Sequence, residues 1–177
     1  MSARLQSAVV LFTLAWGCAR SSSSAPEPTP APNPLTTLEQ MDRRSPLPLL
    51  PMMAHHQKQN MRDHLAAVQE VVAALALEQF AEVERAAKRL GFTEQMGQMC
   101  THMGAGAPGF SERAVAFHRT ADGIVTAARA KDGVGVLKEL GATLEACTSC
   151  HAAWKQQVVD DATWQRLASD AKPAVRH

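Results

Sequence analysis

Several features that common protein classes need are scarce in this sequence. It has no tyrosine, only 5% aromatic residues and four cysteines among 177 residues. Its 18 basic and 17 acidic side chains give a formal charge of +1, so the chain has no basic field and nucleic acid is not expected as a partner. Clusters of β-branched residues and hairpin turn pairs are almost absent, which makes strands unlikely. The composition permits a core of aliphatic residues and alanine.

The first eighteen residues have the pattern of an export signal. Arg4 precedes an apolar run over residues 8–16, which is too short to span a bilayer but has the length of a signal-peptide apolar region. The segment ends in Gly17-Cys18, which resembles a bacterial lipoprotein cleavage site, where the cysteine accepts the lipid. Trp16 departs from the small or aliphatic residue usual there, and cleavage nearby without a lipid is the alternative. Both interpretations predict a protein exported to the periplasmic side of a bacterial membrane.

Residues 19–50 are predicted to form a Ser/Pro-rich tether. Four serines are followed by a proline at every second position from Pro26 to Pro34, a pattern that forms neither a helix nor a central strand. Such a spacer is extended where it adopts polyproline geometry. Attached to a lipid on Cys18, it would hold a domain away from the membrane. A leader without a lipid is the alternative.

Apolar residues recur at helical spacing over residues 51–158, where Pro108 is the only proline after Pro51. These residues form four apolar stripes, one for each of four predicted helices: Met61, Leu65, Val68, Val72 and Leu75; Phe80, Val83, Ala87 and Leu90; Ala114, Phe117, Ala121, Ile124 and Ala128; and Leu137, Leu140, Leu144, Cys147, His151, Trp154 and Val158. Ser111 and Asp132 are plausible N-terminal caps for the third and the fourth of these helices. Mostly short connections predict an all-α fold, an antiparallel four-helix bundle, followed by a C-terminal tail over residues 159–177.

The fourth stretch contains the motif Cys147-Thr148-Ser149-Cys150-His151. Helical spacing places Cys147 and His151 on one face, one turn apart, with Cys150 beside them. A dithiol redox site usually starts a helix after a strand, whereas this pair lies deep inside a predicted helix. A structural zinc site needs four ligands, and Cys100 with His102 would have to reach the motif from a distant loop.

Covalent haem attachment is the third interpretation, and the motif together with the predicted export favours it. Each cysteine adds across a haem vinyl group to form a thioether, and the adjacent histidine binds the iron. Attachment of c-type haem in bacteria takes place outside the cytoplasm, in agreement with the export signal. The sequence therefore predicts one covalent haem c held by Cys147, Cys150 and His151.

The stretch "CTSCHAAWK" resembles the end of the cytochrome c′ family's haem-binding chains, Cys-x-x-Cys-His-x-x-aromatic-basic, here with Trp154 and Lys155. The stretches "MMAHHQKQNMRDHLAAV" and "AFHRTA" resemble the first and third helices of the same family. The resemblance covers residues 51–158. It implies a four-helix bundle with the haem near the C-terminal end of its last helix, redox proteins as partners, and a possible homodimer.

The resemblance also implies that the first helix supplies the second axial position of the iron, where the alignment places Met61. A thioether ligand there would give low-spin iron of raised potential, closed to outside ligands and suited to electron transfer. His56 and His64 are competing ligands. A Met61 that only packs against the haem would leave a pocket for nitric oxide or carbon monoxide. Gln57 stands where many cytochromes c′ have an arginine, so a contact from this turn of the helix to a haem propionate is in doubt. Arg62 could make such a contact instead.

The expected function is therefore that of a membrane-tethered electron carrier rather than a catalyst, with His151 and Met61 as axial ligands. A cytochrome c′-type protein binding nitric oxide or carbon monoxide is the alternative, and a thiol or metal module without haem is a third. The stretch "EQMGQMCTHMG" is expected to be a loop that covers the haem or the bundle end, or otherwise a soft-metal site. His118 is expected between helices, and Cys100 receives no role.

Overall fold

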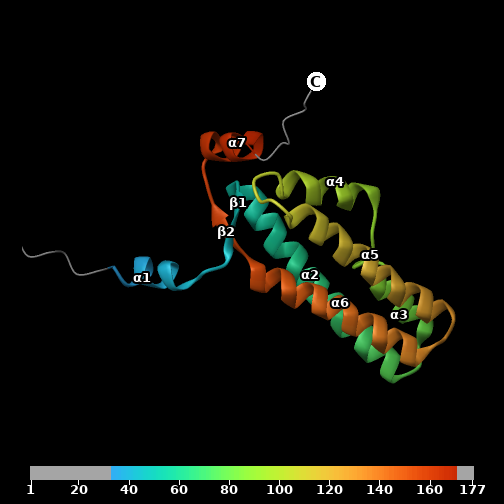
Figure 1. The fold of residues 1–177 in the computed structure, drawn as a ribbon. Coiled ribbons are helices and arrows are strands. Elements are labelled where there is room, and N and C mark those ends of the chain that lie inside the picture. Colours follow the sequence, from blue (N-terminus) through green and yellow to red (C-terminus); the bar gives the residue numbers. More distant parts are fainter. Residues whose placement is uncertain (1–32, 171–177) are drawn as a thin grey trace, which may run out of the picture. The chain divides into compact units, whose positions relative to one another are not determined.

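The structure is a computed structural model that describes residues 33–170 (Figure 1). The predicted signal peptide with Cys18, most of the tether and the last residues of the predicted tail lie outside the described residues. The chain divides into two compact units, residues 1–41 and residues 42–177. The described part of the first unit holds α1 (Pro34–Met41), which buries none of its residues. The Asn33 side chain accepts a hydrogen bond of 3.0 Å from the amide of Leu35 at the start of α1.

The second unit is mostly helical. Its described part holds six helices and two short strands: β1 (Ser45–Leu49), α2 (Pro51–Ala76), α3 (Phe80–Ala87), α4 (Glu94–Met103), α5 (Phe110–Arg129), α6 (Gly133–Ala153), β2 (Trp154–Val158) and α7 (Asp161–Asp170). The four predicted helical stretches correspond to α2, α3, α5 and α6. Within residues 33–170, every helix is too short or too polar to cross a membrane.

The two strands differ from the sequence prediction, which made strands unlikely. β1 and β2 pair in parallel, with Ser45 opposite Trp154 and Leu49 opposite Val158 (Figure 1). Leu47 and Leu49 are at most 2% exposed, so this part of the predicted tether belongs to the folded unit. Pro46 can stand in β1 because both members of a two-stranded sheet are edge strands. The fourth helical stretch accordingly stops at Ala153 and continues to Val158 as a strand.

The stretch expected to be a loop forms the helix α4. Thr93 caps it, since the Thr93 hydroxyl accepts a hydrogen bond of 3.1 Å from the amide of Met96. Glu94 in the first turn complements the helix dipole. α4 ends at Met103, and Gly104 caps its C-terminal end. The loop prediction was wrong, because the Thr93 cap and the acidic first turn favour a helix here.

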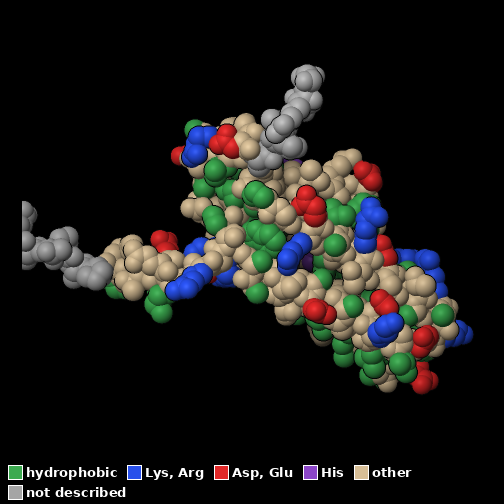
Figure 2. Space-filling model, viewed as in Figure 1, with side chains coloured by type: hydrophobic (Ala, Val, Ile, Leu, Met, Phe, Trp, Pro, Cys, Tyr) green, Lys and Arg blue, Asp and Glu red, His purple; other side chains and the backbone are tan. Residues whose placement is uncertain are grey.

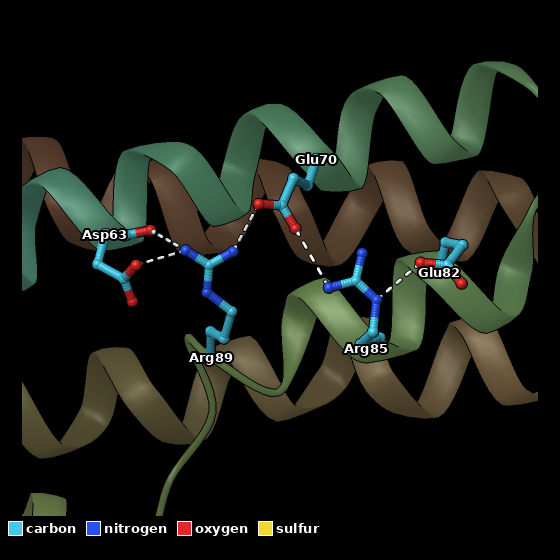
Figure 3. Close-up of polar contacts among 5 residues, drawn as sticks. All are labelled: Asp63, Glu70, Glu82, Arg85 and Arg89. Atoms are coloured by element: carbon cyan, nitrogen blue, oxygen red, sulfur yellow. Dashed lines mark hydrogen bonds and ion pairs between the residues drawn. The ribbon is translucent and has the colours of Figure 1, made fainter.

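A main core lies between α2, α3, α5 and α6 and is rich in alanine, which lets helices approach closely. Its buried members are Ala67, Val71, Ala74, Val83, Ala86, Ala87, Leu90, Ala121, Ile124, Val125, Ala128, Val136 and Leu140. On its surface, Arg89 bonds to Asp63 and Glu70, and Arg85 to Glu70 and Glu82 (Figure 3). These ion pairs tie the segment of α3 to α2.

Several large apolar residues of the predicted stripes on α2 and α6 lie outside this core. Met61 is 39% exposed, Leu65 70% and Leu144 40%. Figure 2 shows hydrophobic side chains on the surface where α2 ends and α6 begins. Leu140 of the α6 stripe is buried as predicted, whereas α2 packs through Ala67, Val71 and Ala74, so the inward face predicted for α2 was wrong.

Candidate functional site

The predicted haem motif occupies the last two turns of α6. Cys147 and Cys150 are half-buried and His151 is exposed. α6 begins at its predicted cap, since the Asp132 carboxylate accepts a hydrogen bond of 2.9 Å from the amide of Gly135. The motif thus lies at the C-terminal end of a helix, where the helix dipole does not favour a thiolate.

The environment of the two thiols also argues against a dithiol redox site. Burial raises the pKa of both Cys147 and Cys150 above the ordinary value of a thiol. Reactive redox cysteines need a lowered pKa, because the thiolate is the nucleophile. Within residues 33–170, no three His, Cys, Asp or Glu side chains come together as a metal site. Cys100 and His102 therefore do not complete a zinc site with the motif.

An apolar cluster surrounds the Cys150 end of the motif. We call it the motif-end cluster; its buried members are Leu47, Leu49, Ala54, Met103, Ala107 and Phe110. Cys150 packs against this cluster from one side, together with Met53, Met99 and Trp154. Trp154 makes an edge contact with Phe110, with the ring centroids 5.6 Å apart. The second cysteine of the motif thus lies against an apolar cluster that contains three methionines, Met53, Met99 and Met103.

α2 and α6 run in opposite directions and come together at the end where α6 begins (Figure 1). There, the Leu75 side chain lies 3.7 Å from the place that a Cβ on Gly133 would take. Met61 lies fourteen residues before Leu75, and Cys147 lies fourteen residues after Gly133. At a rise of about 1.5 Å per residue, both are about 21 Å from that end. By this count, Met61 and the first cysteine of the motif are equally far along their helices from that end.

The residues at this level fit a haem. Two thiols three residues apart are on neighbouring positions of the helix surface, with an imidazole one turn from the first. By the same count of residues, Leu65 and Leu144 lie at nearly equal distances from the end where α6 begins. Both leucines are exposed, as Met61 is. Covering exposed apolar side chains is favourable by about 25 cal/mol per Å². A flat apolar group joined to Cys147 and Cys150 would find apolar side chains to cover on both helices.

The competing ligand His64 is enclosed in the core rather than exposed beside Met61. It is 8% exposed, and its ring centroid lies 5.3 Å from that of Phe117 and 5.4 Å from that of His118. Burial, reinforced by the nearby His118, lowers the pKa of His64 to about 4. His118 lies between helices as predicted, with Nδ1 2.7 Å from the carbonyl oxygen of Leu90. His56, the other competitor, is exposed on the first turns of α2.

The two residues considered for a propionate contact lie in different environments. Gln57 is 7% exposed, and its side-chain oxygen Oε1 accepts a hydrogen bond from the side-chain Nε2 of Gln156 in β2. This bond joins α2 to the strand that follows the motif. Arg62 is exposed, as expected of a surface arginine.

Three charged residues near the motif were not found from the sequence. Arg44 donates from Nη1 to the backbone oxygen of His151 at 3.2 Å, and Asp42 holds Arg44 from the other side. The guanidinium carbon of Arg113 lies 5.4 Å from the centre of the Trp154 ring. No sequence signal connects these residues to the motif, because only the fold brings them there.

Comparisons with known proteins gave no match. No protein-family model, no curated protein and no solved structure matches this chain. The resemblance to the cytochrome c′ family therefore rests on the motif and on the two helical stretches quoted above.

Proposed function

We propose that the protein is an exported c-type cytochrome that transfers single electrons through one covalent haem. The Cys147-Thr148-Ser149-Cys150-His151 motif at the end of α6 carries this proposal, and the exposed thioether of Met61 on α2, equally far by residue count from the end where α6 begins, supports it. In this proposal α2, α3, α5 and α6 form an antiparallel four-helix bundle. When bound, the haem supplies an iron that changes its oxidation state by one electron.

Each residue of the site has a defined task in this function. Cys147 and Cys150 would hold a haem through thioethers, and the His151 imidazole would bind its iron. Met61 would supply the second ligand and so exclude outside ligands. Leu65 and Leu144 exclude water from the faces of the haem, which favours the less charged state of the iron. Cys18 carries a lipid, and the tether places the haem domain on the periplasmic side of a membrane.

A visible spectrum of the protein, exported in a host with the haem-attachment machinery, tests the proposal. We expect a low-spin spectrum with a methionine–iron charge-transfer band and haem that stays bound after denaturation. Met61→Ala should abolish the band, whereas Met52→Ala, which changes a 65% exposed methionine of the same helix, should keep it. Cys147→Ser combined with Cys150→Ser should remove all covalent haem. Wild-type protein without covalent haem would refute the proposal.

The exposure of Met61 supports a second function. Met61 is 39% exposed, so the core does not fix its thioether in place. A Met61 that fails to bind would leave five-coordinate iron and a pocket for nitric oxide or carbon monoxide. A high-spin spectrum that shifts when carbon monoxide is added to the reduced protein would establish this function instead. Mass spectrometry of the exported protein separately tests the lipid on Cys18.

A further inference from the structure

The end of α6 that carries the motif is tied to the segment before β1. α6 ends at Ala153, so the carbonyl of His151 is one of the last four carbonyls, for which an α-helix offers no partner of its own. Arg44 supplies the partner, since its Nη1 donates to the His151 oxygen at 3.2 Å. A side-chain donor of this kind satisfies the end of a helix and complements its dipole. Arg44 thus holds the backbone of the very residue that is expected to bind the iron.

The pairing of the two strands brings Arg44 to this position. Ser45 of β1 lies opposite Trp154 of β2, and the strands run in parallel. Arg44 precedes Ser45 by one residue, and Ala153, the last residue of α6, precedes Trp154 by one residue. The register of the sheet therefore places Arg44 beside the end of α6, although 107 residues separate it from His151.

Asp42 fixes the guanidinium of Arg44. Its Oδ1 accepts a bond of 2.9 Å from Nε and its Oδ2 accepts one of 2.8 Å from Nη2. A two-pronged bond of this kind fixes the plane of a guanidinium as well as its distance. Asp42 is in turn tied to β2, because its backbone oxygen accepts a bond of 2.8 Å from Nζ of Lys155. We call Asp42 and Arg44 the helix-end clamp.

We propose that Arg44 is a positioning residue for His151: the helix-end clamp holds the last turn of α6 in the conformation from which the imidazole binds iron. This inference rests on the proposed haem function. The side chain of His151 is exposed, so the core does not fix its direction, and the backbone from which it projects must do so. Groups that hold a metal-binding residue in place commonly change the strength of its bond to the metal. Arg44 acts here through its hydrogen bonds and not through its charge.

Three variants separate these two ways of acting. Arg44→Met removes the donors and the charge but keeps the aliphatic part of the side chain. Arg44→Lys keeps the charge but cannot bond both oxygens of Asp42 and the His151 carbonyl at once, because an ammonium group lacks the planar fork. Arg43→Met is the matched control, since it removes an exposed positive charge one residue earlier in the chain.

The first measurement is the iron–imidazole stretching band in the resonance Raman spectrum of the reduced haem protein. This band reports the bond to His151 directly, and a general loss of stability does not move it as long as the protein is folded. All variants are made together with Met61→Ala, so that His151 is the one axial ligand. We expect Arg44→Met and Arg44→Lys to broaden the band and shift it to lower frequency, and Arg43→Met to leave it unchanged.

Amide hydrogen exchange in the Cys147→Ser/Cys150→Ser protein tests the helix-end clamp without haem. Losing a hydrogen bond from a charged donor should let the amides of residues 151–154 exchange about tenfold faster in Arg44→Met and in Arg44→Lys. Amides of residues 137–140, at the other end of α6, should be unaffected in both variants. Arg43→Met should exchange at the rates of its parent throughout α6.

Three results would overturn the inference. An unchanged Raman band in Arg44→Met would show that Arg44 does not position His151, whatever the exchange rates. A band in Arg44→Lys identical to that of its parent would show that a positive charge alone is sufficient. Unchanged exchange in Arg44→Met would show that the helix-end clamp does not hold the end of α6. A wild type without covalent haem would instead refute the haem function, and the positioning role would fall with it.

Discussion

The two ends of the helical unit are built differently. At the end far from the motif, α2, α3, α5 and α6 enclose thirteen buried apolar residues. Six of them are alanines, and Val71, Val83, Leu90 and Ile124 are at 0% exposure. At the motif end, six buried residues form the motif-end cluster, while Met61, Leu65 and Leu144 remain exposed and both motif cysteines are half-buried. Both ends leave some apolar side chains exposed, among them Val134 and Leu137 at the first end, but only the second end also carries the two thiols of the motif.

This difference indicates which part of the protein depends on a bound group. A soluble protein exposes single apolar residues without consequence, but several exposed on the helices that flank a pair of thiols are consistent with a surface that a bound group covers. In the proposed function this group is the haem joined to Cys147 and Cys150. The main core should then be independent of the haem, and the motif end should need it.

The largest effect on stability is expected in the main core. Ile124→Ala should lower the free energy of unfolding by about 3–4 kcal/mol, because Ile124 is fully buried and its removal leaves a cavity. The loss should be equal in the haem-loaded protein and in the Cys147→Ser/Cys150→Ser variant. Urea unfolding followed by circular dichroism measures it. Val134→Ala, at an 80% exposed position, is the control and should change the free energy by less than about 0.5 kcal/mol. A much smaller loss for Ile124→Ala in the haem-free variant would contradict an independent core.

The buried pair of His64 and His118 should make the core sensitive to acid. The pKa of His64 is lowered from 6.5 to about 4 in the folded state, so the unfolded chain binds a proton between these values and the folded protein does not. Stability is therefore complete above about pH 6.5 and falls as the pH is lowered towards 4, by about 3 kcal/mol for His64 alone. The pKa of His118 is lowered too, mainly by burial, and acts in the same direction.

His64→Gln should remove most of this dependence, as measured by urea unfolding at intervals between pH 4 and pH 7. His56→Gln, which changes an exposed histidine two turns earlier on α2, should retain the full dependence. An unchanged slope in His64→Gln would mean that His64 is protonated in the folded protein, and hence that it is not buried as the structure shows.

The sequence was sufficient to find four of the helices, but not α4 and not all the faces through which the helices pack. The absence of proline and the helical spacing located α2, α3, α5 and α6, because both are local properties of the chain. The inward face of α2 was wrong, because alanines at 67 and 74 pack closely while Leu65 and Val72 stay outside. β1 was missed because its burial comes from pairing with a strand more than a hundred residues away.

The same distinction holds for the candidate site. Cys147, Cys150 and His151 stand out from the sequence as a candidate haem-attachment motif, because their spacing is the one that such attachment needs. Arg44 and Arg113 do not, because their contacts with His151 and Trp154 depend on the complete fold. His64 was a competitor of Met61 on nearly the same face of the predicted helix, and in the structure His64 is packed against Phe117 of α5 while Met61 is exposed.

A smaller effect is expected from the ion network on the main core (Figure 3). Arg89→Met should lower the free energy of unfolding by about 1.5 kcal/mol, because Arg89 bonds to both Asp63 and Glu70 and its side chain is only 31% exposed. Arg85→Met is the matched control, since Arg85 is 61% exposed and should contribute less than about 0.5 kcal/mol. Repeating the urea unfolding in 1 M NaCl should reduce the difference between the two variants. Equal losses for both variants would show that burial of Arg89 adds nothing to its ion pairs.

The smallest effect, and the one that separates the two ends most clearly, is expected at Leu65. In the haem-free Cys147→Ser/Cys150→Ser variant, Leu65→Ser should change the free energy of unfolding by less than about 0.5 kcal/mol, because Leu65 is 70% exposed. In the haem-loaded protein the same change should cost about 1 kcal/mol more, because the leucine would then be covered by the haem. Leu77→Ser, at a 68% exposed position beyond the end of α2, should cost the same in both proteins. Equal losses for Leu65→Ser in both would mean that this face of α2 does not cover the haem, and Met61, one turn away on the same face, would lose its place as the axial ligand.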